Sequence, residues 1–261
     1  MKKIKVVVAG PRGRMGREAV NMILAVPNFQ LVAAVDYKYG GQDLAFMSNI
    51  PVYENCERCF ADLSVDVLVD FTTPTVGKMN AETALKHKVH PVVGTTGFSS
   101  AAIDELRDLA EANQTGAIIA PNFAIGAILM MEFAKTAAKY FPDVEIIEYH
   151  HDRKLDAPSG TAIKTAELIA NERQRKSQGD PDEKEFLAGA RGADFDGMKI
   201  HSIRLPGLLA HQQVLFGGTG ETLSIRHDSL DHSSFMTGVQ MAIDKVMKLD
   251  TLIYGLENIL D

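Results

Sequence analysis

The sequence predicts an α/β protein in which a doubly wound parallel sheet is joined to a second, α+β domain with an open mixed sheet. The first half alternates short β-branched runs with amphipathic helical patterns, which is typical of a parallel sheet covered on both faces. The second half places three strand patterns in succession, and a Gly-Gly-Thr-Gly turn separates the last two. That arrangement favours a smaller sheet with mostly antiparallel pairings.

The strands expected in the first domain carry continuous apolar runs rather than an alternating pattern. Such runs are typical of parallel strands that are buried on both faces. Helical patterns with an apolar stripe follow most of them. The expected strands span residues 4–9, 29–36, 65–71, 91–96 and 116–122, and the expected helices span residues 14–26, a stretch ending near His87, residues 99–113 and a stretch up to Phe141.

The pattern changes after residue 122, where we expect a second domain over residues 123–231. One segment in it, Arg173–Gly197, is charged and glycine-rich without a clear period, and we interpret it as a solvated loop. The other elements are strands at 144–151, 198–205, 211–218 and 221–227, and a helix at 161–174.

A final helix over residues 233–249 carries apolar residues at positions 235, 239, 242, 243 and 246. This spacing gives one apolar stripe, which must be buried against another element. We expect it to cover the sheet of the first domain, which would then comprise residues 1–122 and 232–261.

Composition excludes several classes of function. A formal net charge of −7 argues against nucleic acid as the main partner, and no apolar run approaches the roughly 20 residues of a membrane span. The basic start is followed by too few apolar residues for a signal peptide.

Cys56 and Cys59 lack the further ligands of a zinc site, so we interpret them as ordinary thiols in a connecting segment and expect no metal. A reducing cytoplasm is the expected location.

Three glycines, Gly10, Gly13 and Gly16, lie between the first strand and the first helix. A turn without side chains lets a pyrophosphate approach the backbone and the positive N-terminus of the helix, as in a Rossmann-type dinucleotide site. The spacing is Gly-x-x-Gly-x-x-Gly instead of the common Gly-x-Gly-x-x-Gly, so an ordinary tight turn stays open as an alternative.

Asp36 ends the second strand, twenty residues beyond Gly16. An acid at this position can accept hydrogen bonds from the ribose hydroxyls of the adenosine, although a surface carboxylate is the simpler alternative. Its charge disfavours a 2′-phosphate, but Arg14 and Lys38 can offset the repulsion. We therefore expect both NADH and NADPH to be used.

Two later strands end in Phe-Thr-Thr-Pro-Thr (71–75) and Gly-Thr-Thr-Gly-Phe (94–98). Small residues at the carboxyl ends of strands leave room for a flat nicotinamide ring, and ordinary helix-starting turns are the alternative. The residues concerned are Phe71, Thr72, Gly94, Thr95 and Thr96.

The stretch 148–170, EYHHDRKLDAPSGTAIKTAELIA, places two histidines, a lysine and the start of a helix close together in one loop. Histidine suits proton donation because its unperturbed pKa is about 6.5, and Lys154 adds a positive charge. A helix starting at Ser159-Gly160-Thr161 offers backbone N–H groups to an anion. Structural histidines and a simple helix cap are the alternatives, but the combination favours a site for a small acidic substrate.

The same stretch closely resembles the signature of the dihydrodipicolinate reductase family. AGPRGRMG, the Phe-Thr-x-Pro motif, GTTGF and APNFAIG (120–126) resemble the family's other motifs in the same order, so the resemblance covers most of the chain. It implies an N-terminal nucleotide domain, a substrate domain with a mixed sheet, a C-terminal helix returning to the first domain, and a homotetramer assembled through the substrate-domain sheets.

The resemblance also implies an activity, the reduction of 4-hydroxy-tetrahydrodipicolinate (dihydrodipicolinate) in lysine and diaminopimelate biosynthesis. Hydride from NADH or NADPH would add at C4 of the cyclic imine, His150 would be the general acid, and Lys154 would support proton transfer and hold the substrate. His151, Gly160 and Thr161 would bind the carboxylates of this dicarboxylate. The family motifs add Arg12, Met15, Ala120, Pro121, Asn122 and Phe123 to the cofactor residues Gly10, Gly13, Arg14, Gly16, Asp36, Lys38, Phe71, Thr72, Gly94, Thr95 and Thr96.

One position departs from some relatives, because Thr73 stands where they carry arginine. Two other functions stay open: a catalytically inactive, nucleotide-sensing protein of the same fold, and another nicotinamide oxidoreductase that acts on a small acid. Acyl-enzyme chemistry is disfavoured, because no serine lies in a nucleophile elbow and both cysteines lie away from the expected site.

Overall fold

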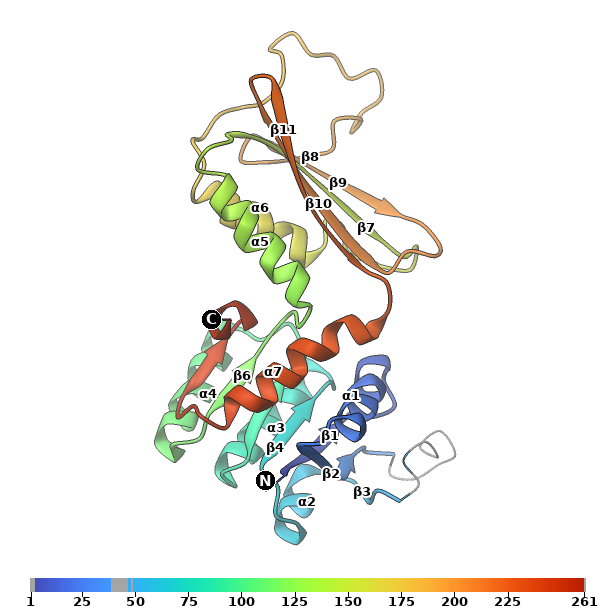
Figure 1. Ribbon diagram of the computed structural model, residues 1–261, viewed down its shortest axis with the longest axis vertical. Helices are drawn as coiled ribbons and strands as arrows, with labels where there is room; N and C mark the ends of the chain where they lie inside the picture. The colour runs from blue at the N-terminus through green and yellow to red at the C-terminus, as the bar shows by residue number, and fades with distance from the viewer. Residues whose placement is uncertain (1–2, 39–46, 48, 261) are drawn as a thin grey trace. The chain divides into compact units, whose positions relative to one another are not determined.

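The computed structural model describes residues 3–38, 47 and 49–260, which form two compact units (Figure 1). Unit 1 comprises Met1–Ile125 and His232–Asp261, and unit 2 comprises Gly126–Asp231. Each unit has its own sheet, of seven strands in unit 1 and five strands in unit 2. The predicted fold class, a doubly wound sheet plus a second α+β unit, is confirmed.

The sheet of unit 1 is parallel at every pairing. The chain runs from β1 outward to β2 and β3, then returns to the other side of β1 and continues through β4, so the direction of winding reverses between β1 and β4. The strand order is β12 (Leu252–Tyr254), β6 (Ala117–Ile119), β5 (His90–Val93), β4 (Val67–Asp70), β1 (Ile4–Ala9), β2 (Phe29–Val35), β3 (Val52–Tyr53).

Helices cover both faces of this sheet (Figure 1). The C-terminal helix α7 contacts β5, β6 and α1, and its buried residues include Val239, Ile243 and Val246, so the prediction that it packs on the first sheet is confirmed. On the other face α3 contacts both α2 and α4. The helices are α1 (Arg14–Ala25), α2 (Cys56–Asp62), α3 (Pro74–Lys86), α4 (Ser100–Asn113) and α7 (Met236–Val246), with short 3-10 helices η2 (His232–Phe235) and η3 (Leu256–Ile259).

The two cysteines lie on α2, and their interpretation as part of a connecting segment was wrong. Asn55 caps this helix by accepting a hydrogen bond from the Arg58 N–H at 3.0 Å. Cys56, Cys59 and Phe60 are buried on one face, which packs into the core. Burial raises the pKa of both thiols, that of Cys59 to about 12, so they are protonated and unreactive at neutral pH.

The sheet of unit 2 is mixed, with β7 parallel to β9 and its other pairings antiparallel. Helices α5 (Ile125–Ala137) and α6 (Gly160–Ala170) lie on one face (Figure 1). Along β7 the buried residues Val144, Ile146 and Glu148 alternate with less buried ones, so these three side chains lie on the same face. The strand order is β11 (Glu221–Ser229), β10 (Ala210–Gly218), β7 (Asp143–His150), β9 (Met198–Arg204), β8 (Ala193–Phe195).

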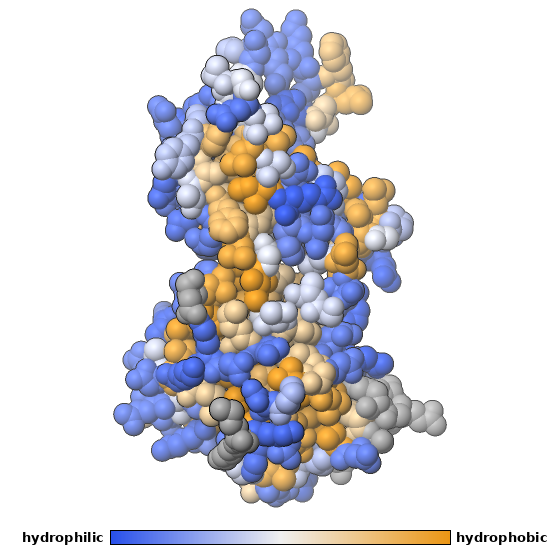
Figure 2. Space-filling view, in the orientation of Figure 1, coloured by the Kyte–Doolittle hydropathy of each residue, from blue (hydrophilic) through white to orange (hydrophobic). Residues whose placement is uncertain are grey.

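Most of the segment Arg173–Gly197 is an exposed loop, as we expected, and only its two ends are fixed by regular structure or burial. Its end forms β8, and the buried Arg173 guanidinium donates hydrogen bonds to the carbonyls of Pro142, Lys176 and Asp196. The surface at the top of Figure 2 is mostly hydrophilic and includes one cluster of hydrophobic residues. Phe186 is 95% exposed and Leu187 is 77% exposed in this segment.

Within the described residues, no helix combines the length and the apolar character that a membrane crossing requires.

Candidate functional site

The glycine turn of unit 1 has the close backbone approach that a pyrophosphate site requires. Gly10 adopts φ +79°, a left-handed conformation that favours glycine, and a Cβ there would lie 2.9 Å from the Phe71 carbonyl oxygen. A Cβ at Gly16 would overlap the Gly10 carbonyl oxygen. Gly13 caps α1 in extended conformation, so the first N–H groups of α1 lie directly after the turn.

Asp36 lies beside this turn and is 7% exposed. Its Oδ1 is 3.0 Å from Nε of Arg12 and accepts a hydrogen bond from the Lys38 N–H at 2.9 Å. The ion pair places a guanidinium from the glycine turn next to the acid at the end of β2. An arginine there lowers the repulsion that the carboxylate exerts on a phosphate.

Asp70, at the end of β4, joins the two threonine-containing turns. Its buried Oδ1 accepts hydrogen bonds from the Thr72 N–H at 2.9 Å and the Thr72 hydroxyl at 2.7 Å, and lies 3.4 Å from the Thr95 hydroxyl. Its Oδ2 accepts from the Asn80 amide at 2.7 Å. These hydrogen bonds lower the pKa of Asp70, but burial has the larger effect, so the pKa is raised overall. The carboxyl group thereby fixes both turns relative to β4.

The residues expected to bind the cofactor all follow the carboxyl ends of neighbouring strands of unit 1. Ligands of open α/β sheets bind along this edge, beside the point where the winding reverses. Phe71 and Phe123 contact each other edge to face at 6.1 Å between ring centroids. Gly10, Arg12, Gly13, Arg14, Met15 and Gly16 follow β1, Asp36 and Lys38 follow β2, Phe71 and Thr72 follow β4, Gly94, Thr95 and Thr96 follow β5, and Ala120, Pro121, Asn122 and Phe123 follow β6.

In unit 2, His150 is the last residue of β7 and points to the helix-covered face, like Glu148 two residues before it. Its side chain is 15% exposed, and its Nδ1 forms a short hydrogen bond with Oε2 of Glu148. Glu148 is fully buried. His151 follows the strand, and its Nδ1 is buried without a hydrogen-bond partner among the described residues.

Glu148 is held by three groups besides His150. Arg204 donates to both carboxylate oxygens, at 2.9 Å to Oε2 and 2.7 Å to Oε1, and the Ser159 N–H lies 3.3 Å from Oε1. Burial alone would raise the pKa of Glu148, but the hydrogen bonds from His150, Arg204 and Ser202 outweigh it and lower the pKa to about 2. Glu148 is therefore an anion at neutral pH.

The rest of the loop leads to the N-terminus of α6. Lys154 Nζ contacts both carboxylate oxygens of Asp156, at 2.7 and 2.9 Å. The Ser159 hydroxyl caps α6 by accepting from the Ala162 N–H at 3.2 Å. A Cβ added at Gly160 would meet open space, so the first turn, which contains Gly160 and Thr161, has room in front of it. A cation and the start of a helix thus lie on the loop that carries His150.

Comparison with known families gives two matches that together span nearly the whole chain. Residues 4–123 match the model of the dihydrodipicolinate reductase N-terminus, and residues 126–260 match that of the C-terminus. The chain belongs to the dihydrodipicolinate reductase family. The resemblance found in the sequence motifs is thereby confirmed.

Individual relatives agree with this family over full length. The chain is 61% identical to the 4-hydroxy-tetrahydrodipicolinate reductase of Geobacillus thermodenitrificans, covering 99% of each chain. It is 63% identical to that of Halalkalibacterium halodurans, covering 99% of this chain and 100% of the relative. A solved dihydrodipicolinate reductase from Paenisporosarcina sp. TG-14, with dipicolinate bound, is 50% identical with a TM-score of 0.89, covering 99% of this chain and 100% of that one.

Two residues of the candidate site, Glu148 and Arg204, were missed by sequence reasoning. Glu148 belongs to the quoted motif, but a glutamate in a strand reads as a solvent-facing residue. The alternation of β7 was the available signal, because it places Glu148 on the same face as Val144 and Ile146. Arg204 is 56 residues away and gave no signal, because only the pairing of β7 with β9 brings it next to His150.

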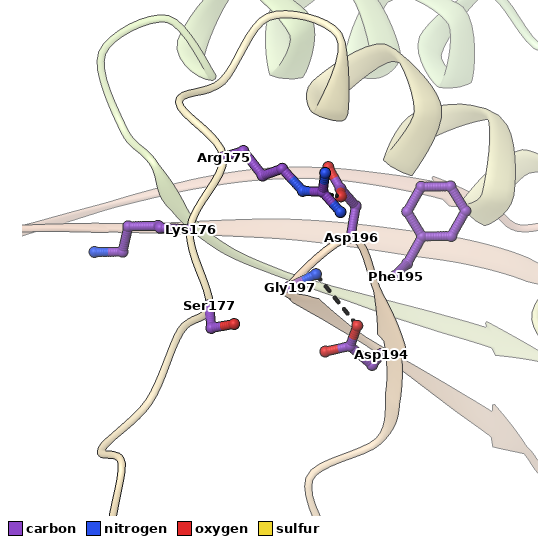
Figure 3. A pocket seen from close by; sticks show the side chains of 7 residues that line it. All are labelled: Arg175, Lys176, Ser177, Asp194, Phe195, Asp196 and Gly197. Atoms are coloured by element: carbon purple, nitrogen blue, oxygen red, sulfur yellow. Dashed lines mark hydrogen bonds and ion pairs between the residues drawn. The ribbon is translucent and has the colours of Figure 1, made fainter.

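A separate hollow of about 490 Å³ in unit 2 lacks the features of a reaction site. Figure 3 shows that Arg175 and Asp196, which line it, face each other, and their ion pair is 2.7 Å long. Lys176 is paired with Asp143 at 2.7 Å. These charges neutralise each other, so the hollow offers no concentrated charge to a ligand.

Proposed function

We propose that this protein reduces 4-hydroxy-tetrahydrodipicolinate to tetrahydrodipicolinate with NADH or NADPH. The observation that carries the proposal is the loop from His150 to Thr161, which supplies a proton donor, a cation and the start of a helix within one short stretch. The chain is also about 60% identical to proteins named 4-hydroxy-tetrahydrodipicolinate reductase. The fold adds a dinucleotide-type turn at the carboxyl edge of a parallel sheet.

In the proposed reaction, the 4-hydroxy substrate loses water across C4 and C5 to give the conjugated cyclic imine, and a bound reduced nicotinamide would supply the hydride that C4 of this imine accepts. The resulting enamine needs one proton at carbon to become the product imine. His150 donates it from Nε2, since its Nδ1 is engaged by Glu148. Lys154 holds the substrate and supports the proton transfer.

The substrate is a dianion, and the loop offers it three kinds of partner. Lys154 supplies charge once a substrate carboxylate competes with Asp156 for the ammonium group. The N–H groups of Gly160 and Thr161 lie in the first turn of α6, where they have no intrahelical acceptor and the helix dipole is positive. His151 is the third partner, with one buried ring nitrogen that has no acceptor or donor among the described residues.

The assay that tests this function follows absorbance of the nicotinamide. Oxidation of NADH that depends on freshly generated 4-hydroxy-tetrahydrodipicolinate supports the reductase. Binding of NADH without turnover would favour the nucleotide-sensing protein, and turnover with a different small acid alone would favour another oxidoreductase.

We predict that both cofactors are used, with kcat/KM values for NADH and NADPH that differ by less than about a hundredfold, or roughly 3 kcal/mol. Asp36 can accept from the ribose hydroxyls of NADH. Arg12, paired with Asp36 at 3.0 Å, together with Lys38, can compensate for the 2′-phosphate of NADPH. Steady-state kinetics with each cofactor at saturating substrate would measure the ratio, and a larger preference for either would refute the prediction.

The family resemblance leads us to propose a homotetramer assembled through the sheet of unit 2. The face opposite α5 and α6 carries Ile147 on β7 and Ile203 on β9. A hollow of about 830 Å³ lined by these two residues and by glycines of the Arg173–Gly197 segment can receive apolar groups of another copy. The exposed Phe186 and Leu187 are apolar groups of that kind.

Light scattering is expected to give four times the mass of one chain. Ile147→Asp should yield a lower mass, because it would bury an unpaired carboxylate at the interface, whereas Met79→Asp, on an exposed face of α3 in unit 1, should not. A wild-type protein that is monomeric at micromolar concentration would disprove the assembly.

We also propose a cytoplasmic location, because a reductase of a biosynthetic intermediate draws on intracellular nicotinamide, and the two cysteines are free thiols.

A further inference from the structure

Glu148 is the most completely enclosed charged group of unit 2, and the reaction as described uses it only as the partner of His150 Nδ1. It is fully buried, and each carboxylate oxygen has at least two donors. Oε2 faces His150 Nδ1 and an Arg204 nitrogen, and Oε1 faces the other terminal Arg204 nitrogen and the Ser159 N–H. These donors come from three different segments, and with the hydrogen bond from Ser202 they leave the carboxylate one orientation.

The direction of the bond between Glu148 and His150 follows from the charge of the carboxylate. A carboxylate without a proton can only accept, so Nδ1 of His150 must carry the hydrogen. The second ring nitrogen, Nε2, is then the one that can exchange a proton with a ligand. Because Arg204 and Ser159 fix the carboxylate, the ring plane of His150 is fixed too.

We propose that Glu148 is a positioning residue: its carboxylate holds the Nδ1 proton of His150, so that the imidazolium presents the Nε2 proton to the enamine carbon. After donation, His150 is left neutral with its hydrogen on Nδ1, still bound to Glu148, and it regains a proton at Nε2 from solvent. Arg204 supports this arrangement by neutralising Glu148, and the Ser159 N–H ties it to the start of α6. The proposal rests on the proposed role of His150 as the proton donor.

The kinetic test compares Glu148→Gln with Glu167→Gln, which removes the same charge from an exposed position on α6. Glu148→Gln should lower kcat by about 10- to 100-fold and leave KM for NADH within about twofold, because unit 1 is unchanged. Glu148→Asp should retain more kcat than Glu148→Gln, and Glu167→Gln should match the wild type. A folded Glu148→Gln enzyme with kcat within twofold of the wild type would overturn the proposal.

A second measurement needs no variant at site 148 to fold. ¹⁵N NMR of histidine-labelled wild-type protein, with the His150 resonance assigned by its loss in His150→Gln, should show neutral His150 protonated at Nδ1. Protonation at Nε2 instead would overturn the role of Glu148. The two proposals fail separately, because an inactive wild-type protein would refute the reductase activity, whereas the tautomer reports on Glu148 alone.

Discussion

His150→Gln is expected to lower kcat by about 10²- to 10⁴-fold, the range that general acid catalysis contributes. Glutamine fills similar space and can still form a hydrogen bond with Glu148, but it has no proton to give to the enamine carbon. KM for the substrate should rise far less than kcat falls, because in the proposed function other groups of the loop bind the carboxylates. Steady-state absorbance assays at saturating NADH would measure both parameters.

A matched control is His87→Gln, at the C-terminus of α3 in unit 1, where His87 pairs with Glu57 on the surface. This variant should keep wild-type kinetics. That result would show that losing a histidine outside the candidate site does not change the activity. A His150→Gln enzyme with normal kcat would remove His150 from the role of general acid.

Lys154→Ala is expected to lower kcat and raise KM for the substrate, with a combined loss in kcat/KM of about 10²- to 10³-fold. The estimate corresponds to losing about 3–4 kcal/mol, which is the scale of charge-assisted hydrogen bonds to a partly desolvated dianion. Lys154→Arg should recover part of the loss, because it keeps the charge but not the position of the ammonium group.

The stability of Lys154→Ala separates a functional from a structural role. The contact between Lys154 and the largely exposed Asp156 is a surface ion pair, so its removal should change the free energy of unfolding by less than about 1 kcal/mol. Lys164→Ala, on the exposed side of α6, serves as the control for loss of a lysine. Loss of kcat/KM with unchanged thermal unfolding supports the binding role, and wild-type kinetics in Lys154→Ala would contradict it.

The elements that the sequence predicted well are those with a strong local pattern. β1 and β4 lie between other strands with helices on both faces, so their residues are buried without alternation, as the apolar runs indicated. The stripe of Val239, Ile243 and Val246 identified α7 and its packing because a helix with one apolar face must cover another element.

The elements that the sequence missed are short or depend on distant partners. β3 and β12 have two and three residues, too few for a periodic pattern, and they exist because an edge of the parallel sheet is available to them. The seven-residue helix α2 was missed because its apolar positions include two cysteines, which suggested chemistry rather than packing.

The candidate site shows the same division between local and distant information. His150, Lys154 and the helix start at Ser159 lie within one short stretch, so their residue types and spacing could be read directly. The carboxylate of Glu148 is instead held by Arg204, which reaches it only through the pairing of β7 with β9. A single sequence contains no local pattern for that contact.

The central claim, that a reduced nicotinamide delivers hydride to a cyclic imine dicarboxylate on this protein, is tested most directly by isotope transfer. Reaction with NADH carrying deuterium at C4 of the nicotinamide, in one stereochemical position at a time, should place deuterium at C4 of the product for one of the two labels. The adjacent ring carbon should then carry hydrogen from the solvent, as NMR of the product would show. Product without deuterium from either labelled NADH, or with deuterium at another carbon, would contradict the account.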